Sequence, residues 1–171
     1  MRSGWAGIAI AAGLTLCSLA VRADAVAPSA PGSELYSPSR MCVAKVLEDA
    51  LSRGLRTRFY SNGFLVRDVS GVRELAWADE VLVFTVAPQA GDPGVYAWDC
   101  AGGTLRRVVK PERSSREHPG GSDVFRLVQI EEDVLYYAHA PDVDSPSLER
   151  DLTRDIKTLR LKPPATQLSM R

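Results

Sequence analysis

One part of the chain recurs, and this recurrence limits the folds that the chain can adopt. The apolar pattern of residues 75–88 returns at residues 127–141, and that of residues 104–111 returns at residues 158–163. The two copies are offset by 52 to 53 residues. A fixed period of this length predicts a repeated supersecondary unit. We therefore expect two related units, repeat one over residues 72–111 and repeat two over residues 124–163.

Both repeats have the apolar patterns of β-strands joined by short polar turns. Strands are expected at residues 72–77, 81–87, 95–100, 104–109, 124–130, 134–140 and 156–161. Residues 147–155 fit either a strand or a helical turn. The run 81–87 is apolar without clean alternation, which predicts a central strand that is buried on both faces.

The segment before repeat one contains the strongest turn signal of the chain. Asn62 and Gly63 stand between two short apolar runs, and both residue types accept the positive φ angles of a type I′ turn. This arrangement predicts a β-hairpin over residues 55–69.

An amphipathic helix is expected earlier, over residues 40–54. Its apolar residues follow the spacing i, i+3, i+4, i+7 and i+8, and they are Val43, Val46, Leu47, Ala50 and Leu51. That spacing places them on one stripe of a helix, and Gly54 would end it. We expect this helix to cover a face or an edge of the sheet.

Repeat one also resembles a known family. Residues 81–85, 94–99 and 102–108, with Trp77 before them, resemble a blade of WD-like β-propellers, of the type in periplasmic Tol-system propellers and prolyl-peptidase propeller domains. The resemblance implies a small twisted antiparallel sheet whose middle strands are covered by neighbouring blades. It also implies scaffolding or recognition. Repeat two departs from the pattern, because it lacks the Gly-Gly turn.

The number of repeats bears on how they can be arranged. A closed propeller needs at least four blades, whereas residues 26–171 hold two, or three if the hairpin counts as one. The predicted fold is therefore mainly antiparallel β with one N-terminal helix, as an incomplete propeller or a sandwich-like α+β domain over residues 40–164. A larger bent sheet and a ring of several chains, which would be a homo-oligomer, remain alternatives.

The N-terminal residues have the composition of a secretory signal. Residues 1–25 combine Arg2 with a short apolar run and with small residues that suit cleavage after Ala23 or Ala25. We expect a periplasmic or secreted protein without a stable membrane span after removal of the signal. Residues 26–39 are rich in Pro, Gly and Ser and predict a flexible linker, and residues 165–171 predict a disordered tail.

Two cysteines remain once this signal is removed. An even number of cysteines in an exported chain favours a disulfide, so we expect Cys42 to bond to Cys100. The alternative is two buried free thiols.

No residue pattern in the chain predicts catalysis, a cofactor or a metal. The two histidines, His118 and His139, lack zinc-ligand spacing, and no Gly-x-Ser-x-Gly motif is present. Lys and Arg together number 21, and so do Asp and Glu. This balance gives no overall reason to expect a nucleic acid as partner.

A local excess of basic residues follows the last strand of repeat one. These candidates for partner binding are Arg106, Arg107, Lys110, Arg113, Arg116 and His118. They suggest a contact surface for an acidic partner, on a connection that is long for a β-protein. The alternative interpretation is a solvated strand end and loop.

These observations favour an exported, non-enzymatic binding module that recognises a protein partner in the cell envelope. One alternative is a periplasmic inhibitor or immunity-type protein that blocks an envelope enzyme. Another is an accessory or degenerate hydrolase. A binding module should expose an apolar or charged patch, whereas an enzyme should have a deep pocket lined by side chains of perturbed pKa.

Overall fold

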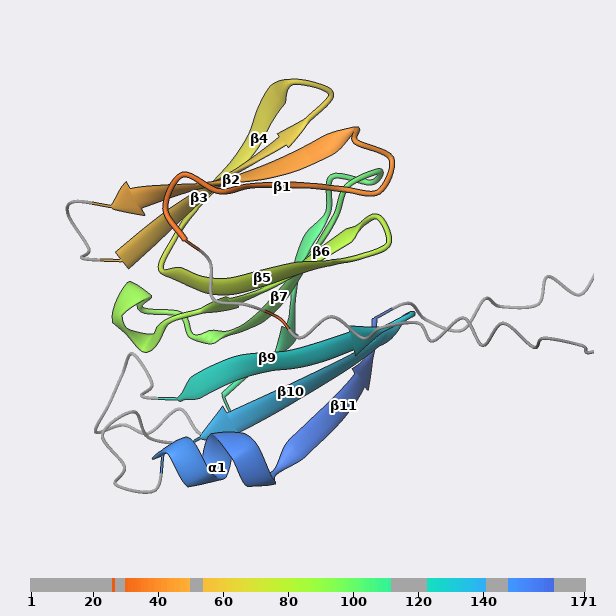
Figure 1. Cartoon of the computed structure of the whole chain (residues 1–171). Helices are drawn as coiled ribbons and strands as arrows, with labels where there is room; N and C mark the ends of the chain where they lie inside the picture. Colours follow the sequence, from red (N-terminus) through yellow and green to blue (C-terminus); the bar gives the residue numbers. More distant parts are fainter. Residues whose placement is uncertain (1–25, 27–29, 50–53, 112–122, 141–147, 162–171) are drawn as a thin grey trace, which may run out of the picture.

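The computed structural model describes residues 26, 30–49, 54–111, 123–140 and 148–161 (Figure 1). Within these residues the chain is mainly β, with eleven strands in three antiparallel sheets and a single short α-helix. The predicted β-rich fold class is therefore confirmed. The expected signal, residues 1–25, and the expected tail, residues 165–171, lie outside the described residues.

The first sheet is formed by four strands that follow one another along the chain. In order across the sheet they are β1 (Glu34–Tyr36), β2 (Cys42–Asp49), β3 (Gly54–Ser61) and β4 (Phe64–Ser70). Asn62 and Gly63 join β3 to β4 with φ angles of 49° and 82°. The predicted hairpin is confirmed, because these two residue types tolerate positive φ at little cost.

The helix predicted over residues 40–54 is wrong. The segment Cys42–Asp49 is instead strand β2, which pairs with β1 on one side and with β3 on the other. Its inward residues alternate, since Cys42, Ala44 and Val46 are at most 1% exposed. This period of two places all three in the core cluster with Phe59 and Leu82. Residues 50–53 lie outside the described part of the chain.

The flexible linker predicted over residues 26–39 is also wrong in part. Residues Glu34–Tyr36 form β1, and the Val46 N–H donates a hydrogen bond of 2.9 Å to the Ser33 carbonyl. Proline and serine composition therefore did not keep this segment away from the sheet, because the unpaired edge of β2 offers backbone partners to it.

The middle sheet corresponds to repeat one. Its strands, in order across the sheet, are β5 (Val72–Ala78), β6 (Val81–Val86), β7 (Gly94–Asp99) and β8 (Leu105–Val109). A short 3-10 helix, η1 (Pro88–Ala90), lies between β6 and β7. All four strands expected in this repeat are present.

The third sheet corresponds to repeat two but departs from it after two strands. It contains β9 (Val124–Glu131), β10 (Val134–Ala140) and β11 (Ile156–Arg160), in the order β11-β10-β9. The ambiguous segment is helix α1 (Leu148–Arg154). As a result β11 pairs directly with β10, at the place that β7 takes beside β6 in the middle sheet.

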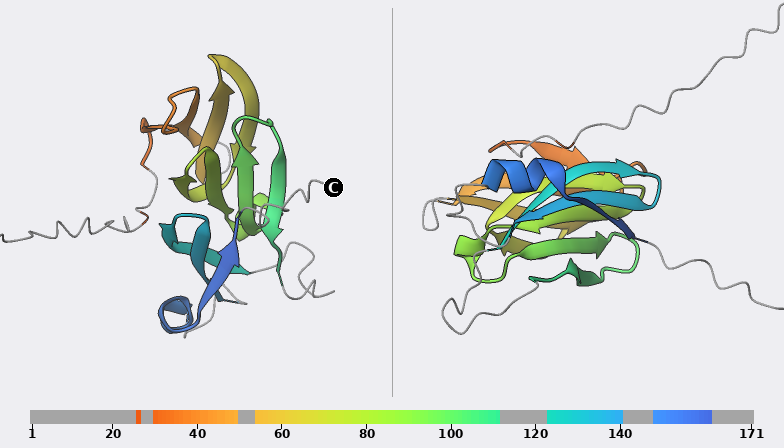
Figure 2. Two further views of the ribbon diagram at one scale, coloured as in Figure 1. Left: turned by 90° about the vertical axis from the view of Figure 1, so that its right-hand side faces the viewer. Right: turned by 90° about the horizontal axis from the view of Figure 1, so that it is seen from below.

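The three sheets stack face to face, with the sheet of repeat one in the middle (Figures 1 and 2). Successive residues of β6 point to opposite faces, so Leu82 and Phe84 pack toward the first sheet while Val83 packs toward the third. All three side chains are fully buried. The prediction that this strand is covered on both faces is confirmed.

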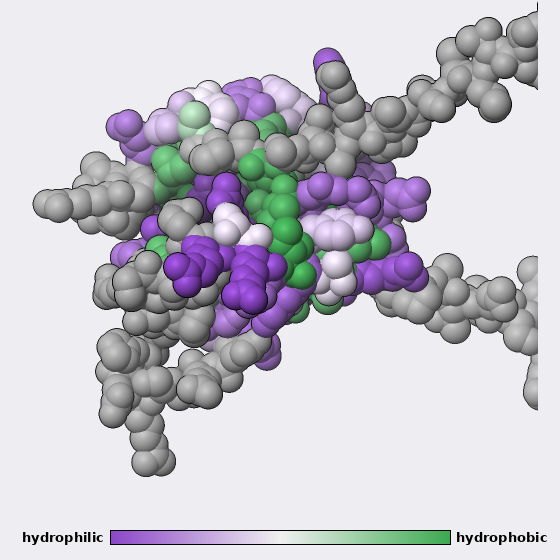
Figure 3. Space-filling model, turned by 60° about the horizontal axis from the view of Figure 1, so that its bottom comes forward, coloured by the Kyte–Doolittle hydropathy of each residue, from purple (hydrophilic) through white to green (hydrophobic). Residues whose placement is uncertain are grey.

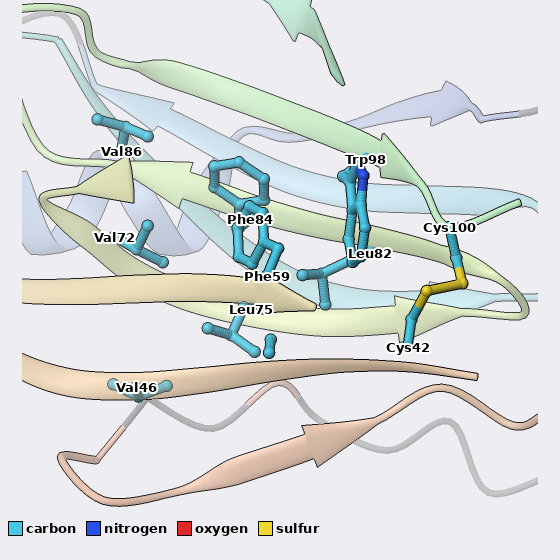
Figure 4. Packing of buried hydrophobic residues seen from close by; sticks show 11 residues of the cluster. Cys42, Val46, Phe59, Val72, Leu75, Leu82, Phe84, Val86, Trp98 and Cys100 are labelled. Carbon is cyan, nitrogen blue, oxygen red and sulfur yellow. A yellow bond between two sulfur atoms is a disulfide. The ribbon is translucent and has the colours of Figure 1, made fainter. Parts of the chain in front are cut away.

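The core between the first and middle sheets is aromatic. Phe59 of β3 stacks on Trp98 of β7 with ring centroids 5.2 Å apart, and it meets Phe84 at 5.1 Å (Figure 4). Contacts between large buried rings of this kind stabilise a fold by more than the burial of their apolar area alone. The same core contains the disulfide Cys42–Cys100, whose Cα atoms are 6.1 Å apart. The predicted bridge is confirmed, and it ties the two sheets together.

The third sheet is covered on both of its faces. Its inner residues Phe125, Leu127 and Leu135 pack with Val83 and Val95 of the middle sheet. Its outer face contacts α1, whose buried Leu152 joins a cluster with Val124, Ala138 and Ala140. The stack is thus closed at one end by a helix, and its other end is the outward face of the first sheet.

Candidate functional site

The outward face of the first sheet bears a row of apolar and aromatic side chains. In the strand register, Tyr36 lies opposite Val43, Val43 opposite Tyr60, and Tyr60 opposite Leu65. Residues that pair directly point to the same face, and neighbouring strands are about 4.8 Å apart. The row therefore crosses all four strands, and it ends on Tyr36 and Leu65, which are 52% and 53% exposed.

Further apolar side chains extend this row toward the hairpin turn. The Asn62 N–H donates to the Met41 carbonyl at 2.8 Å, which places Met41 beside the turn. Phe64 begins β4 and pairs with Ser61, which pairs with Cys42, so Phe64 is exposed at the edge of the sheet on the opposite face. Val66 has no partner in the register, because β4 bulges between Leu65 and Arg67. We call the set of exposed large apolar residues along this row the apolar surface, and its members are Tyr36, Met41, Leu65 and Val66.

A row of charged residues runs beside the apolar surface. Glu34, Lys45, Arg58 and Asp68 are paired in the register across the four strands. Lys45 Nζ lies 2.6 Å from Glu34, while Asp68 contacts both Arg56 at 2.6 Å and Arg58 at 3.3 Å. With Arg56, which lies beside the row, these charged residues comprise three basic and two acidic side chains, so their formal charge is slightly positive.

These ion pairs favour the charged forms of the two acids. The hydrogen bond from Arg56 is the largest cause that lowers the pKa of Asp68, and Arg58 adds to it. The hydrogen bond from Lys45 lowers the pKa of Glu34 in the same way. Both acids lie at the surface, where such pairs contribute little to stability. The row therefore acts mainly as a fixed pattern of charge beside the apolar surface.

The basic residues expected to bind a partner are not gathered into one surface by the structure. Arg106 and Arg107 are consecutive on β8 and so point to opposite faces. Arg106 donates to the Leu161 carbonyl, and Arg107 contacts the Asp92 carboxylate and the Pro93 carbonyl. Lys110 is exposed after β8. Arg113, Arg116 and His118 lie outside the described residues.

Arg107 belongs to a small cluster that fixes the start of β7. Its guanidinium carbon lies 5.7 Å from the centre of the Tyr96 ring, and the Tyr96 hydroxyl donates to Asp92 at 2.8 Å. Burial, followed by this hydrogen bond, raises the pKa of Tyr96 to about 12. The Arg107 side chain is only 20% exposed, so it stabilises the loop before β7 more than it offers charge to a partner.

His139 forms a pair that the sequence did not predict. Its Nε2 lies 2.6 Å from Asp123 Oδ1, both side chains are 6% exposed, and its ring stacks on Phe125. The two residues are 16 positions apart and meet only because β9 pairs with β10. Among the described residues, no group of three or more His, Cys, Asp or Glu side chains could hold a metal ion.

The apolar surface was missed for a different reason. Phe64, Leu65 and Val66 are three consecutive apolar residues directly after the Asn-Gly turn, where strict alternation would place only half of them inward. That excess could have indicated an exposed patch. By contrast, most of the coloured surface on the side of the third sheet and α1 is hydrophilic, with a hydrophobic band across its middle and smaller hydrophobic spots at its margins (Figure 3).

Comparisons of this chain with protein-family models, with curated proteins and with solved structures found no match. In the part of the chain that the structure describes, no helix is long and apolar enough to cross a membrane.

Proposed function

We propose that this chain is an exported, non-enzymatic binding module that recognises a protein partner through the outward face of its first sheet. One observation carries the proposal: Tyr36 and Leu65, at the two ends of the outward row, are 52% and 53% exposed, and Met41 and Val66 beside them are 51% and 37% exposed. Contiguous exposed apolar patches on a monomer mark sites of interaction. The other end of the stack, in contrast, is covered by α1.

The residue types of this face also favour a protein as the ligand. Tyr, Phe, Met and Arg are enriched in the cores of protein interfaces, and Tyr and Arg are frequent among residues that dominate the binding energy. Here Tyr36 and Tyr60 belong to one register row, and Arg58 lies two residues from Tyr60 on the same face of β3. The slight excess of positive charge would suit a partner whose contact segment combines apolar and acidic residues.

The stacking of the sheets is consistent with the resemblance to propeller blades. Each of the first two sheets is a four-stranded meander, and consecutive blades of a propeller have this form. In a closed ring the outward face of a blade is covered by the next blade. We propose that the partner takes that place here.

The compartment is part of the same proposal. The buried Cys42–Cys100 bridge suits the oxidising conditions of the periplasm or the cell exterior, where disulfides persist. The composition of residues 1–25, which is that of a secretory signal, also supports export.

The proposal is tested with surface variants that leave the core intact. The chain is immobilised, its partner is captured from an envelope extract and identified, and the affinity of the purified pair is measured. The double variant Tyr36→Ser/Leu65→Ser should bind at least about 10-fold more weakly, because each lost anchor contributes on the order of 1 kcal/mol or more. Its folding should change little, since both residues are half exposed.

A matched control uses an exposed apolar residue on another sheet. Ile156 of β11 is 47% exposed, so Ile156→Ser removes a similar apolar area away from the first sheet. This variant should bind the partner as the native chain does. Equal affinities of the double variant and the native chain would refute the proposed surface.

A further inference from the structure

A pocket of about 340 Å³ lies apart from the apolar surface, where the middle sheet meets the end of β11. The volume is at the small end of the range for ligand pockets in proteins, so it suits a small molecule rather than a folded partner. The residues that give the pocket its chemical character are Val81, Ala97, Asp99, Thr104, Arg106 and Leu161.

The strand register explains why the residues of the middle sheet meet in this pocket. Val81 of β6 pairs with Asp99 of β7, and Ala97 of β7 pairs with Arg106 of β8. Directly paired residues point to the same face of a sheet. This face of the middle sheet is the one that packs on the third sheet.

Part of the lining is apolar and held in a fixed position. Val81, Ala97 and Leu161 supply this part, and Ala97 and Leu161 are almost fully buried. The Leu161 N–H donates to the Asp133 carbonyl at 2.7 Å, and Arg106 donates to the Leu161 carbonyl. The apolar part of a small ligand would therefore meet a surface that is already formed.

The pocket also contains two opposite charges that do not neutralise each other. Asp99 and Arg106 both line it, and in the part of the chain that the structure describes neither of them forms an ion pair. Glu80 lines the pocket too, but its two carboxylate oxygens accept from the Ser39 N–H at 2.8 Å and from the Ser39 hydroxyl at 2.9 Å, on the side of the first sheet. The pocket thus offers one group for a cation and one for an anion.

Both charged groups keep capacity to bind a ligand. Asp99 Oδ1 accepts from the N–H groups of Ala101 and Gly102 at 3.0 and 3.2 Å, which holds the carboxylate in place, and no described residue donates to its Oδ2. A guanidinium has five N–H donors, and one of those of Arg106 is directed at the Leu161 carbonyl. The others remain for a carboxylate, whose shape matches the planar fork of a guanidinium.

The spacing of Asp99 and Arg106 limits the ligand. Ala97 and Arg106 lie directly opposite each other, so Asp99, two residues further along β7, is a diagonal neighbour of Arg106. Diagonal neighbours are roughly 7–8 Å apart. A ligand that bridges them with a charge-assisted hydrogen bond of about 2.8 Å at each end must carry its two charges close together. An ammonium group and a carboxylate on the same carbon atom meet this requirement.

We propose that this pocket binds a free α-amino acid with a small apolar side chain. Arg106 holds the carboxylate of the ligand, Asp99 accepts from its ammonium group, and its side chain packs on Val81, Ala97 and Leu161. The ligand has no net charge, which suits a pocket with one charge of each sign. A polypeptide end does not fit in the same way, because its terminal residue retains only one of the two α-charges.

The test is calorimetric titration of the purified full chain with four compounds. L-Leucine should bind. N-Acetyl-L-leucine lacks the ammonium group, L-leucinamide lacks the carboxylate and glycine lacks the apolar side chain, so each of these should bind at least about 10-fold more weakly than leucine. Absence of leucine binding, or equally tight binding of any of the other three compounds, would overturn the proposal.

Variants assign the two charges to their roles. Arg106→Gln should weaken leucine binding at least about 10-fold and leave leucinamide binding unweakened, and Arg106→Lys should restore part of the leucine binding. Asp99→Asn keeps an acceptor for the two backbone N–H groups and should weaken the binding of leucine and leucinamide alike. Unchanged leucine affinity in a folded Arg106→Gln or Asp99→Asn protein would overturn the assignment.

Two controls separate this pocket from the rest of the surface. Lys110→Gln removes an exposed positive charge that does not line the pocket, so this variant should bind leucine as the native chain does. The double variant Tyr36→Ser/Leu65→Ser should also bind leucine normally, because the apolar surface lies on another sheet. Loss of leucine binding in either control would contradict the placement of the site.

Discussion

Glu74 of β5 links two sheets through a single buried carboxylate. Its Oε2 accepts the Leu127 N–H of β9 at 2.6 Å, and Arg126 lies 3.9 Å from its other oxygen. Burial is the largest influence and raises the pKa of Glu74 above the usual 4.5, although the backbone hydrogen bond and Arg126 act in the opposite direction. The hydrogen bond thus stabilises the packing of the third sheet on the middle sheet, while burial of the negative charge of Glu74 opposes folding.

This conflict predicts how stability depends on pH. Because the pKa of Glu74 is raised in the folded state, the folded chain binds the proton more tightly than the unfolded chain does. The stability from this group is full below the unfolded pKa and decreases as the pH rises through the folded pKa. Glu74→Gln removes the charge and keeps an acceptor oxygen, so its stability relative to the native chain should be higher at pH 7 than at pH 4.

Urea unfolding at the two pH values measures the difference. Glu74→Ala serves as the control, since it leaves the Leu127 N–H without this acceptor and should cost about 1–3 kcal/mol. A Glu74→Gln protein whose advantage over the native chain grows on acidification would contradict the account.

The buried pair of His139 and Asp123 gives a second prediction at this scale. Asp123→Ala would remove the buried carboxylate that lies 2.6 Å from the imidazole, which should lower the free energy of unfolding by about 1–3 kcal/mol. Asp123→Asn preserves the shape and a hydrogen bond, so it should cost less. Chemical denaturation of the two variants checks the order, and an alanine variant as stable as the asparagine variant would show that the pair contributes nothing.

These residues show what single positions reveal before the fold is known. The Cys42–Cys100 bridge could be predicted, because removal of the expected signal would leave two cysteines and a single pairing. The contacts of Glu74 and His139 could not, because each depends on which strands lie side by side and on their register. Arg106 and Arg107 were expected to act together for the same reason, and their strand separates them.

Strands and turns that depend on local sequence signals could be predicted. Segments whose structure depends on pairing with distant strands could not. The turn at Asn62 and Gly63 depends only on positive φ angles and was predicted with its hairpin. The segment Cys42–Asp49 carries apolar residues at both helical and alternating positions. Pairing with β1 and β3 decided between the two, and no pattern within the segment contains that information.

The connection between β4 and β5 depends on Gly71 and yields a prediction. This residue has a φ angle of 76°, and a Cβ atom placed on it would lie 2.4 Å from the Ala90 Cβ. Gly71→Ala should therefore lower the free energy of unfolding by about 2 kcal/mol or more, through backbone strain and overpacking together.

Gly63 is the matched control for that change. Its φ angle is 82°, but nothing lies within 4 Å of the position that a Cβ would take. Gly63→Ala should cost only the backbone strain, about 1–2 kcal/mol. Thermal unfolding of both variants separates the two effects, and equal losses of stability would show that the contact with Ala90 does not destabilise the Gly71→Ala protein.

For the whole molecule, the disulfide is the covalent tie between two of the three layers. It closes a separation of 58 residues, so the double variant Cys42→Ser/Cys100→Ser should lose about 4 kcal/mol of stability. Thermal unfolding with and without reductant is the measurement. Reductant should destabilise the native chain and leave the double variant unchanged, and a native chain insensitive to full reduction would contradict the role of the bridge.

The arrangement of the whole was only partly predictable. The sequence repeat predicted the strands of the middle sheet and the first two strands of the third sheet, because the apolar strand patterns recur there at the repeat period. The stacking order, the helix in repeat two and the exposed face of the first sheet depend on which faces pack together. Leu148 and Leu152 of α1 pack against the outer face of the third sheet, whereas no described element covers Tyr36 or Leu65.

Site-specific photo-crosslinking in the native compartment tests the central claim most directly. A benzophenone side chain is placed either at Leu65 on the apolar surface or at Ile156 on the third sheet, which are similarly exposed at 53% and 47%. We expect a cross-linked protein partner from position 65 and none from position 156. Cross-links from position 156 alone, or no cross-link from position 65 in a folded, exported chain, would contradict it.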